Sequence, residues 1–413
     1  MILQERFLEG LKTIFYIFPF LVFAPFGLSR LRRPKMRIAH IADPHLGYRA
    51  YNRITSQGIN RREADVFKAF QSALAKVAEI QPDLILIAGD LFHIVRPSNL
   101  TIQHTFREFA SLRSKTDAPI VIIGGNHDSP RSADTGCILD LLANLPGIHI
   151  AHSEYVQVPL KKLDTSVFCL CHRALPHLFS LKIEPDPASK RNILLVHGTV
   201  EGVVRHAYDL YELRRAQVIS DAWDYIAFGH YHCFTELAPN AFYAGSLEYT
   251  STSIWSETSV EKGFIEYDLD ERKMIAFHKI DARDVIDLRP IDAKDVTAAD
   301  LNTMIERRVG GIPGGHTDKI VRLVIENLPR GVQQDLDFAF VRAVRADALH
   351  FELQLRPPSR SGRTGDAREA GVSRPLEEEW DEFARVYDAP AGVDRDRLVS
   401  LGKDYLGKQE SAT

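Results

Sequence analysis

Residues 36–45 read MRIAHIADPH. A largely apolar run of this kind, interrupted only by Arg37 and His40, is typical of a strand that is buried on both faces. Two polar residues close the stretch, Asp43 and His45. Because side chains alternate between the two faces of an extended chain, these two would point to the same side. The stretch therefore predicts a buried strand with reactive side chains at its carboxyl end.

Similar apolar runs recur along the chain. They are LILIAG at 84–89, IVIIGG at 120–125, ILLVHG at 193–198 and YIAFGH at 225–230. Apolar spacing predicts helices over 62–80 and 98–113, the second with Ser98 as N-cap. Later runs, FYAGS, GFIEYDLD and MIAFHKI, are predicted as antiparallel strands. This order of elements predicts an α/β fold with a mixed sheet system.

The composition narrows the class of protein. Of 413 residues, 45% are apolar, which excludes a wholly disordered chain. There are 51 Lys or Arg and 55 Asp or Glu, so the net charge is −4. That balance excludes a strongly basic protein that coats nucleic acid. The four cysteines form no C-x-x-C pair, so we expect neither a disulfide framework nor a zinc finger, and a reducing cytoplasm is the natural compartment.

The chain divides into five segments. Residues 1–35 hold an apolar run at 14–28 that is followed by basic residues. Because this order of charge does not suit a signal peptide and two prolines interrupt the run, we expect a mis-assigned translation start, with Met36 as the true one. A membrane anchor is the alternative. The other segments are predicted as a main α/β domain at 36–285, a small α+β domain at 286–356, a flexible linker at 357–374 and two short helices at 375–413.

Possible metal ligands follow every predicted buried strand. They are Asp43 and His45, then Asp90, then Asn126, His127 and Asp128, then His197, and finally His230 and His232. Strand ends of an α/β sheet converge on one crevice, so we expect these side chains to meet there. Carboxylate, carboxamide and imidazole groups suit Mn²⁺, Fe²⁺ or Zn²⁺. These are too many candidates for one ion. They suit two ions that share a carboxylate, activate a bridging hydroxide and clamp a phosphoryl group.

The series DPH (43–45), GDLFH (89–93), GNHD (125–128), VHG (196–198) and GHYH (229–232) resembles the calcineurin-like metallophosphoesterase superfamily. Within it, ADPHLGY, GDLFHIVRPS, FYAGSLEYTS and EKGF resemble the SbcD-type nuclease subunit of DNA double-strand-break repair complexes. The resemblance implies an αββα sandwich with a small α+β capping domain and a C-terminal helical tail. The segment 36–285 would be the nuclease domain, and 286–356 would position DNA.

The resemblance also implies roles for individual residues. A first metal would be held by Asp43, His45, Asp90 and His232. A second would be held by Asp90, Asn126, His197 and His230, with Asp90 as the bridge. His127 would stabilise or protonate the leaving oxygen, and His93 would orient the phosphate or the DNA. Asp128 is expected to orient a histidine. The implied metal is Mn²⁺, with Fe²⁺ or Zn²⁺ as alternatives.

A basic loop follows the first ligands. Between residues 37 and 62 the chain has five arginines and a single carboxylate. Because this loop would lie at the mouth of the site, the arginines predicted to contact DNA are Arg49, Arg53, Arg61, Arg62 and Arg96. The alternative is an ordinary solvated surface.

The C-terminal segment shows apolar residues at helical spacing. They are Leu376, Trp380 and Phe383, then Leu398 and Leu401. Two short helices bury little apolar surface on each other, so we predict that these residues dock a partner. Folding back onto their own chain is the alternative. The resemblance implies that the partner is the SbcC-type coiled-coil ATPase.

The resemblance implies a 3′-to-5′ exonuclease on duplex DNA and an endonuclease on single strands. It also implies a homodimer in the cytoplasm, associated with the nucleoid and without stable membrane association. Two other functions remain open. A small-substrate phosphodiesterase or phosphatase of the same fold would use the same metal set. A non-catalytic scaffold for the ATPase would need none of it.

Overall fold

The computed structural model describes residues 35–130, 132, 135–203, 211–358, 380–381, 383–385 and 394–410. The leader at 1–34, the linker and Leu376 lie outside these residues. The chain forms two compact units, Met1–Pro358 and Ser359–Thr413. Among the described residues, no helix has the length and apolar character that crossing a membrane requires.

The first of two large sheets contains the opening strand of the sequence. Its order is β14-β13-β1-β2-β3-β4, and β1 to β4 are parallel to one another. β13 pairs antiparallel with β1 on one side and with β14 on the other. The strands are β1 Arg37–Ile41, β2 Leu84–Ile87, β3 Ile120–Ile123, β4 Ile148–Ala151, β13 Gly263–Asp268 and β14 Lys273–Lys279.

The second large sheet has the order β11-β12-β10-β7-β6-β5, with parallel pairing from β12 to β6. Its strands are β5 Tyr155–Leu160, β6 Thr165–Leu170, β7 Arg191–His197, β10 Tyr225–Gly229, β11 Thr235–Ala238 and β12 Ala241–Tyr243. The short elements are β8 Thr199–Val200, β9 Glu212–Leu213, α3 Arg215–Val218, and the 3₁₀ helices η2 Ile138–Asn144, η3 Lys161–Leu163, η4 His172–Ser180 and η5 Ile254–Glu257.

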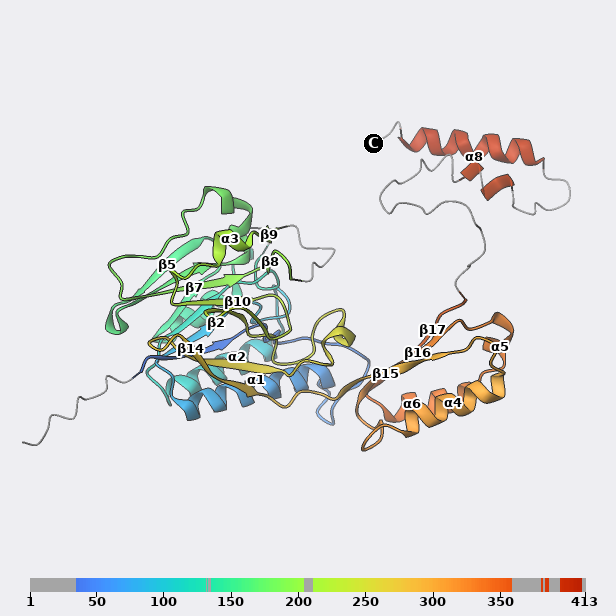
Figure 1. The fold of residues 1–413 in the computed structure, drawn as a ribbon, viewed down its shortest axis with the longest axis horizontal. Coiled ribbons are helices and arrows are strands. Elements are labelled where there is room, and N and C mark those ends of the chain that lie inside the picture. The colour runs from blue at the N-terminus through green and yellow to red at the C-terminus, as the bar shows by residue number, and fades with distance from the viewer. Residues whose placement is uncertain are drawn as a thin grey trace, which may run out of the picture. The chain divides into compact units, whose positions relative to one another are not determined.

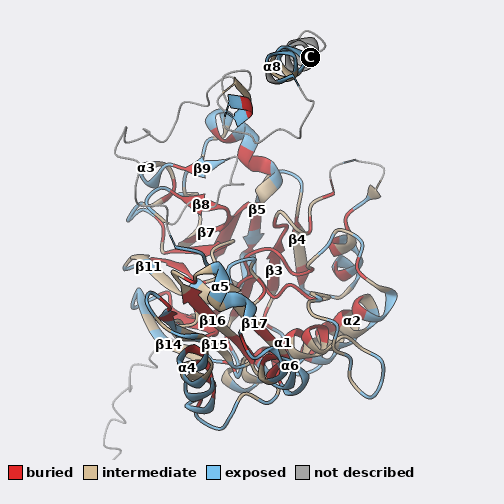
Figure 2. Cartoon of the chain, turned by 90° about the vertical axis from the view of Figure 1, so that its right-hand side faces the viewer, coloured by how far each residue is buried: buried red, intermediate tan, exposed pale blue. Residues whose placement is uncertain are grey.

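The two sheets pack face to face, and the central strands of the first sheet bury side chains on both of their faces. Ile38 of β1 belongs to the core shared with the second sheet, whereas Ala39 belongs to the core shared with the helices. Those helices are α1 Arg61–Ile80 and α2 Asn99–Arg113, and the Ser98 side chain accepts from the Thr101 N–H, as an N-cap does. Figure 2 shows β3 and β7, central strands of the two sheets, buried. The predicted αββα architecture is confirmed. Apolar residues of η4 and α3 belong to the core that contains the second sheet.

A third sheet follows in the sequence and has a core of its own. It consists of β15 Val285–Asp292, β16 Ile320–Glu326 and β17 His350–Leu355, all parallel. Its helices are α4 Ala298–Gly310, α5 Arg330–Gln334 and α6 Phe338–Asp347 (Figure 1). Apolar residues of the helices and strands form one separate cluster.

The C-terminal unit contains α8, Arg395–Glu410, and a short helical piece around Trp380. The Trp380 indole N–H donates to the Val399 carbonyl at 3.1 Å. A β-carbon at Gly402 would lie 2.1 Å from the Trp380 ring, so the ring rests on a position that only glycine leaves open. Phe383 is 53% exposed and Leu401 is 50% exposed, so these two apolar side chains remain largely uncovered within this unit.

Candidate metal centre

The backbone at the strand ends is unusual. Asp43, His45, Asp90 and His230 all have positive φ angles, of 49°, 50°, 49° and 98°. Residues other than glycine adopt this conformation rarely and at a cost. The loops after β1 and β2 hold each other in place, because the His45 N–H donates to the Asp90 carbonyl at 2.9 Å. Four of the described non-glycine residues with positive φ are thus candidate ligands at this edge of the sheets, and strained backbone of this kind is often found at functional sites.

The first ligand group draws on both large sheets. Asp43 and His45 follow β1, and His232 follows β10. One possible ligand atom from each lies within 4.8 Å of the others. The His45 and His232 Nε2 atoms face each other at 3.0 Å, and His45 Nε2 is 3.7 Å from the Asp90 carboxylate. The first ligand group therefore lies next to the Asp90 carboxylate.

The second ligand group lies on the other side of Asp90. Asp90, His197 and His230 also bring ligand atoms within 4.8 Å of one another. His197 Nε2 is 3.4 Å from Asp90 Oδ2. Asn126 Oδ1 is 3.0 Å from both His197 Nε2 and His230 Nδ1. The structure thus brings all seven predicted metal ligands together, in two groups that share the Asp90 carboxylate.

Hydrogen bonds orient several of these groups. His197 Nδ1 is 2.8 Å from the Ala88 carbonyl, so this nitrogen donates its proton there and the ring is oriented with Nε2 toward the site. The backbone N–H of His127 donates to Asp90 Oδ1 at 2.8 Å. A β-carbon at Gly125 would lie 2.0 Å from that same oxygen, so the absence of a side chain makes room for the carboxylate.

Asp128 plays a different part from the one predicted. Its carboxylate accepts from the backbone N–H groups of Leu91, Phe92 and Gly125, at 3.0, 2.8 and 3.2 Å. These contacts join the loop after β2 to the loop after β3. The expectation that Asp128 orients a histidine is therefore wrong, because backbone amides occupy the carboxylate. Its effect on the ligands Asp90 and Asn126 comes from fixing their loops.

His127 and His93 form a pair above the ligand groups. Their rings stack with centroids 4.9 Å apart. His127 Nδ1 is 2.6 Å from the His93 carbonyl, so its Nε2 is not used in that contact. Together with His45 they also form a set of three possible ligands within 4.8 Å. Both histidines therefore lie at the candidate metal centre. Their distances fit either a metal ligand or a proton donor.

Burial sets the charge of the ligands. It raises the pKa of Asp43 to about 8 and lowers the pKa values of His45 and His232 well below their ordinary range. Burial also opposes charge on His197, but the Asp90 carboxylate outweighs it and raises the His197 pKa to about 9. His45 and His232 are therefore neutral at pH 7 and can donate lone pairs. A cation bound by Asp43 and His197 would displace the protons they otherwise hold.

The donor chemistry fits two divalent cations. Buried carboxylates, a carboxamide oxygen and imidazoles match the preference of Mn²⁺, Fe²⁺ and Zn²⁺. His232 Nδ1 is buried without a hydrogen-bond partner, which is understandable if the ring is arranged for a ligand on its other nitrogen. The types of ligand therefore support metal binding at these groups. They suit Mn²⁺, Fe²⁺ and Zn²⁺ alike.

A cleft of about 400 Å³ opens onto both groups. Its lining includes four residues that sequence reasoning did not assign: His172, Thr250, Ser253 and Glu257. The His172 ring centroid lies 6.3 Å from that of His197 and 6.4 Å from that of His230. His172 follows β6 closely, so the strand-end rule would have found it if β6 had been predicted.

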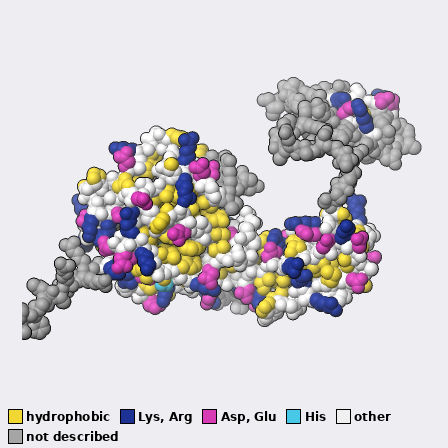
Figure 3. Space-filling model, in the orientation of Figure 1, with side chains coloured by type: hydrophobic (Ala, Val, Ile, Leu, Met, Phe, Trp, Pro, Cys, Tyr) yellow, Lys and Arg dark blue, Asp and Glu magenta, His cyan; other side chains and the backbone are white. Residues whose placement is uncertain are grey.

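The five arginines predicted to contact DNA have different environments. Arg49 is 59% exposed beside Glu63, and Arg96 is exposed. Arg53 donates to carbonyls at the end of α6, and Arg61 pairs with Asp318, so both join the two-sheet body to the third sheet. Arg62 is 1% exposed and bonded to Glu248. The prediction that Arg62 contacts DNA is therefore wrong. Figure 3 shows basic and acidic side chains intermixed on the visible face.

The comparisons with known proteins agree with this geometry. The family described as calcineurin-like phosphoesterase matches residues 36–234. Two curated relatives are DNA double-strand break repair proteins Mre11, from Methanococcus maripaludis and from Archaeoglobus fulgidus. The first is 29% identical over 48% of this chain and 52% of its own length. The second is 30% identical over 59% of this chain and 53% of its own length.

A third Mre11 protein, from Methanocaldococcus jannaschii, is 38% identical over a shorter stretch, 23% of this chain and 24% of its own length. The chain thus spans about half the length of two of these relatives and about a quarter of the third. The similarity to Mre11 proteins agrees with the resemblance to SbcD-type nucleases in the sequence.

Proposed function

We propose that the chain is a two-metal DNA nuclease, because residues 36–234 match the family of calcineurin-like phosphoesterases. The observation that carries this proposal is the pair of ligand groups that share Asp90. Two bound cations would activate water and stabilise negative charge on a phosphate diester. The metal we propose is Mn²⁺, with Fe²⁺ or Zn²⁺ as alternatives.

We assign the ligands as the family resemblance implies. Asp43, His45 and His232 would hold the first cation, and Asn126, His197 and His230 would hold the second, with Asp90 shared between them. The orientation of His197 by the Ala88 carbonyl supports its assignment. Phosphodiester hydrolysis by a metal centre of this kind makes the chain a hydrolase.

His127 is the proposed acid. Its Nδ1 lies against the His93 carbonyl, which leaves Nε2 free to meet the leaving oxygen of the substrate. His93 stacks on His127, and burial lowers the pKa of His93 to about 4. His93 is therefore neutral at pH 7 and acts by orienting the phosphate with a hydrogen bond.

DNA is the proposed substrate because the matched relatives are named as DNA double-strand break repair proteins. Arg49 and Arg96 carry the proposed contacts to the phosphate backbone, since both are exposed on loops that follow ligands. Arg53 and Arg61 would act indirectly, by holding the third sheet as a capping domain. Exonuclease action from 3′ to 5′ on duplex ends and endonuclease action on single strands complete the proposal.

The remaining proposals concern assembly. Trp380, Phe383, Leu398 and Leu401 would dock the coiled-coil ATPase of the complex, and two nuclease subunits would form a homodimer. The exposure of Phe383 and Leu401 supports a docking surface. The chain would act within the cell, on chromosomal DNA.

The test is Mn²⁺-dependent degradation of end-labelled duplex DNA by the full chain. We expect cleavage that a chelator abolishes and that His127→Ala reduces by at least about 100-fold with its metals retained. His177→Ala, at an exposed histidine of η4, is the control and should cleave normally. Hydrolysis of a small phosphodiester without DNA cleavage would support the small-substrate alternative. Metal binding without either activity would support the scaffold.

A further inference from the structure

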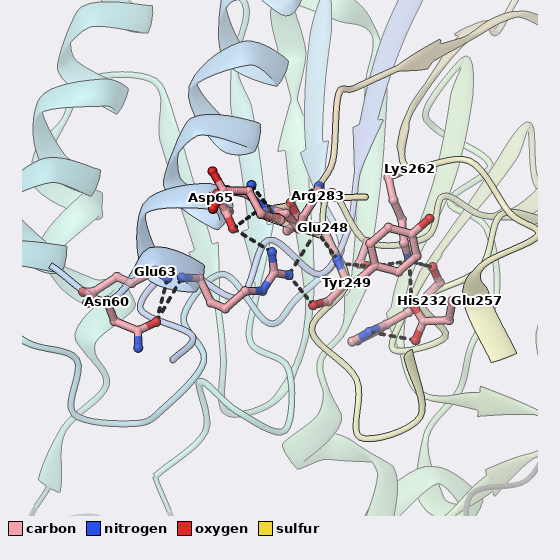
Figure 4. A network of polar contacts seen from close by, with 12 residues as sticks. Asn60, Glu63, Asp65, His232, Glu248, Tyr249, Glu257, Lys262 and Arg283 are labelled. Carbon is pink, nitrogen blue, oxygen red and sulfur yellow. Dashed lines mark hydrogen bonds and ion pairs between the residues drawn. The ribbon is translucent and has the colours of Figure 1, made fainter. Parts of the chain in front are cut away.

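A buried ion pair lies beside the first ligand group and has no part in the mechanism above. Glu257 of η5 is 4% exposed, and Lys262 is 2% exposed. The Lys262 ammonium donates to Glu257 Oε2 at 2.5 Å, to Ser246 Oγ at 2.9 Å and to the His232 carbonyl at 3.0 Å (Figure 4). All three of its protons therefore have acceptors, which a buried ammonium needs.

The second oxygen of Glu257 faces a metal ligand. Glu257 Oε1 lies 3.8 Å from His232 Nδ1, and Figure 4 shows the two side chains pointing toward each other. That nitrogen is buried and has no hydrogen-bond partner. A histidine that binds a metal through Nε2 carries its proton on Nδ1, and this proton normally has an acceptor. Glu257 Oε1 needs to approach by only about 1 Å to become that acceptor.

We propose that Glu257 is the positioning residue of His232. In the metal-bound protein its Oε1 accepts the Nδ1–H, which fixes the tautomer and directs Nε2 at the first cation. Lys262 holds the carboxylate in place and balances its charge. The proposal rests on the proposed two-metal centre and adds to it a pair of residues that act through a ligand.

Two contacts separate this role from that of a purely structural ion pair. Lys262 binds the backbone carbonyl of His232 itself, so the pair fixes both the main chain and the side chain of one ligand. Glu257 also lines the cleft that opens onto the metal groups. A pair needed only to close the turn after η5 would require neither contact.

The test compares Mn²⁺ binding by full-length variants, using calorimetry for affinity and electron paramagnetic resonance for the coupled pair of ions. In Glu257→Gln, Lys262 retains the side-chain oxygen and the amide turns its N–H₂ toward His232 Nδ1. We expect this variant to bind the first cation about 10- to 100-fold more weakly, with the second site unchanged. Glu261→Gln removes an exposed pair with Lys279 and should bind both ions normally.

The double variant Glu257→Gln with Lys262→Met provides a second comparison. Without the ammonium, the glutamine oxygen can turn to His232, so first-site affinity should recover in part relative to Glu257→Gln. If Glu257→Gln alone does not fold, the first-site affinity of the double variant is compared with that of wild type instead. Wild-type affinity at both sites in every variant would overturn the proposal. If wild type binds two ions but cleaves no DNA, the nuclease proposal fails while this comparison still holds.

Discussion

The Nε2 atoms of His45 and His232 lie 3.0 Å apart although 187 residues separate them in the sequence. His45 follows a strand of the first large sheet, and His232 follows a strand of the second. The contact therefore joins the two sheets at the point where a cation would bind. An arrangement in which both lone pairs approach one position is what two ligands of a single ion require.

Replacing Asp90 should affect both cations at once. Its carboxylate lies within 3.7 Å of His45 and within 3.4 Å of His197, one from each group. We expect Asp90→Ala to bind neither of the two Mn²⁺ ions tightly, whereas His45→Ala should lose only the ion at the first site. The measurement is the number of Mn²⁺ ions retained per chain after equilibrium dialysis. Retention of one tightly bound ion by Asp90→Ala would show that the carboxylate is not shared.

Gly125→Ala should disturb the centre without removing a ligand. The added methyl group would lie 2.0 Å from Asp90 Oδ1, so the carboxylate must move. We expect a loss of about 1–3 kcal/mol in the free energy of unfolding and weaker binding of both ions. Gly310→Ala at the end of α4 is the control, because its β-carbon meets nothing within 4 Å. Equal Mn²⁺ affinity in the two variants would contradict this account.

Replacing Arg62 should lower the stability of the protein, whereas replacing Arg96 should weaken its binding to DNA. Arg62→Met leaves the buried Glu248 carboxylate without its partner and should cost about 3–5 kcal/mol of stability. Arg96→Met should leave the melting temperature unchanged but weaken DNA binding. The slope of the logarithm of the binding constant against the logarithm of salt concentration should fall by about one. Thermal denaturation and DNA titration at several salt concentrations measure the two effects. A destabilised Arg96→Met would place that residue in the fold instead.

Protonation of His40 should destabilise the protein in acid. Burial lowers the pKa of His40 from 6.5 to about 3. Below pH 6.5 the unfolded chain binds a proton that the folded chain does not, so stability falls as the pH drops toward 3. The full effect is about 5 kcal/mol. His40→Gln keeps a partner for the Tyr225 hydroxyl and should flatten this dependence in denaturant titrations, whereas the exposed control His177→Gln should not.

The central strands could be predicted because they are buried on both faces. Such strands are almost entirely apolar, and β1, β2 and β3 fall within the predicted runs. β5 escaped notice because it is a partly exposed edge strand that contains Pro159. A proline is tolerated at an edge, where one side of the backbone has no neighbouring strand, but it weakens a strand signal in the sequence.

The ligands could be predicted for a similar reason. Each directly follows a recognisable strand, so their convergence was implied by the fold. The environment of Arg62 could not be predicted, because its acidic partner Glu248 lies 186 residues away. Glu257 was missed for the same reason. Its relation to His232 arises only when folding brings η5 close to the residues after β10, and local sequence carries no signal for that contact.

Arg283 joins elements that belong to different sheets. Its side chain pairs with Asp65 of α1 and donates to the Asp318 carbonyl beside β16, and its backbone N–H donates to Glu248. The segment that leads into β15 is therefore held by hydrogen bonds toward both sides. A rotation of the third sheet about it would have to give up the contact to the Asp318 carbonyl and the Arg61–Asp318 pair, so movement at this segment costs polar contacts.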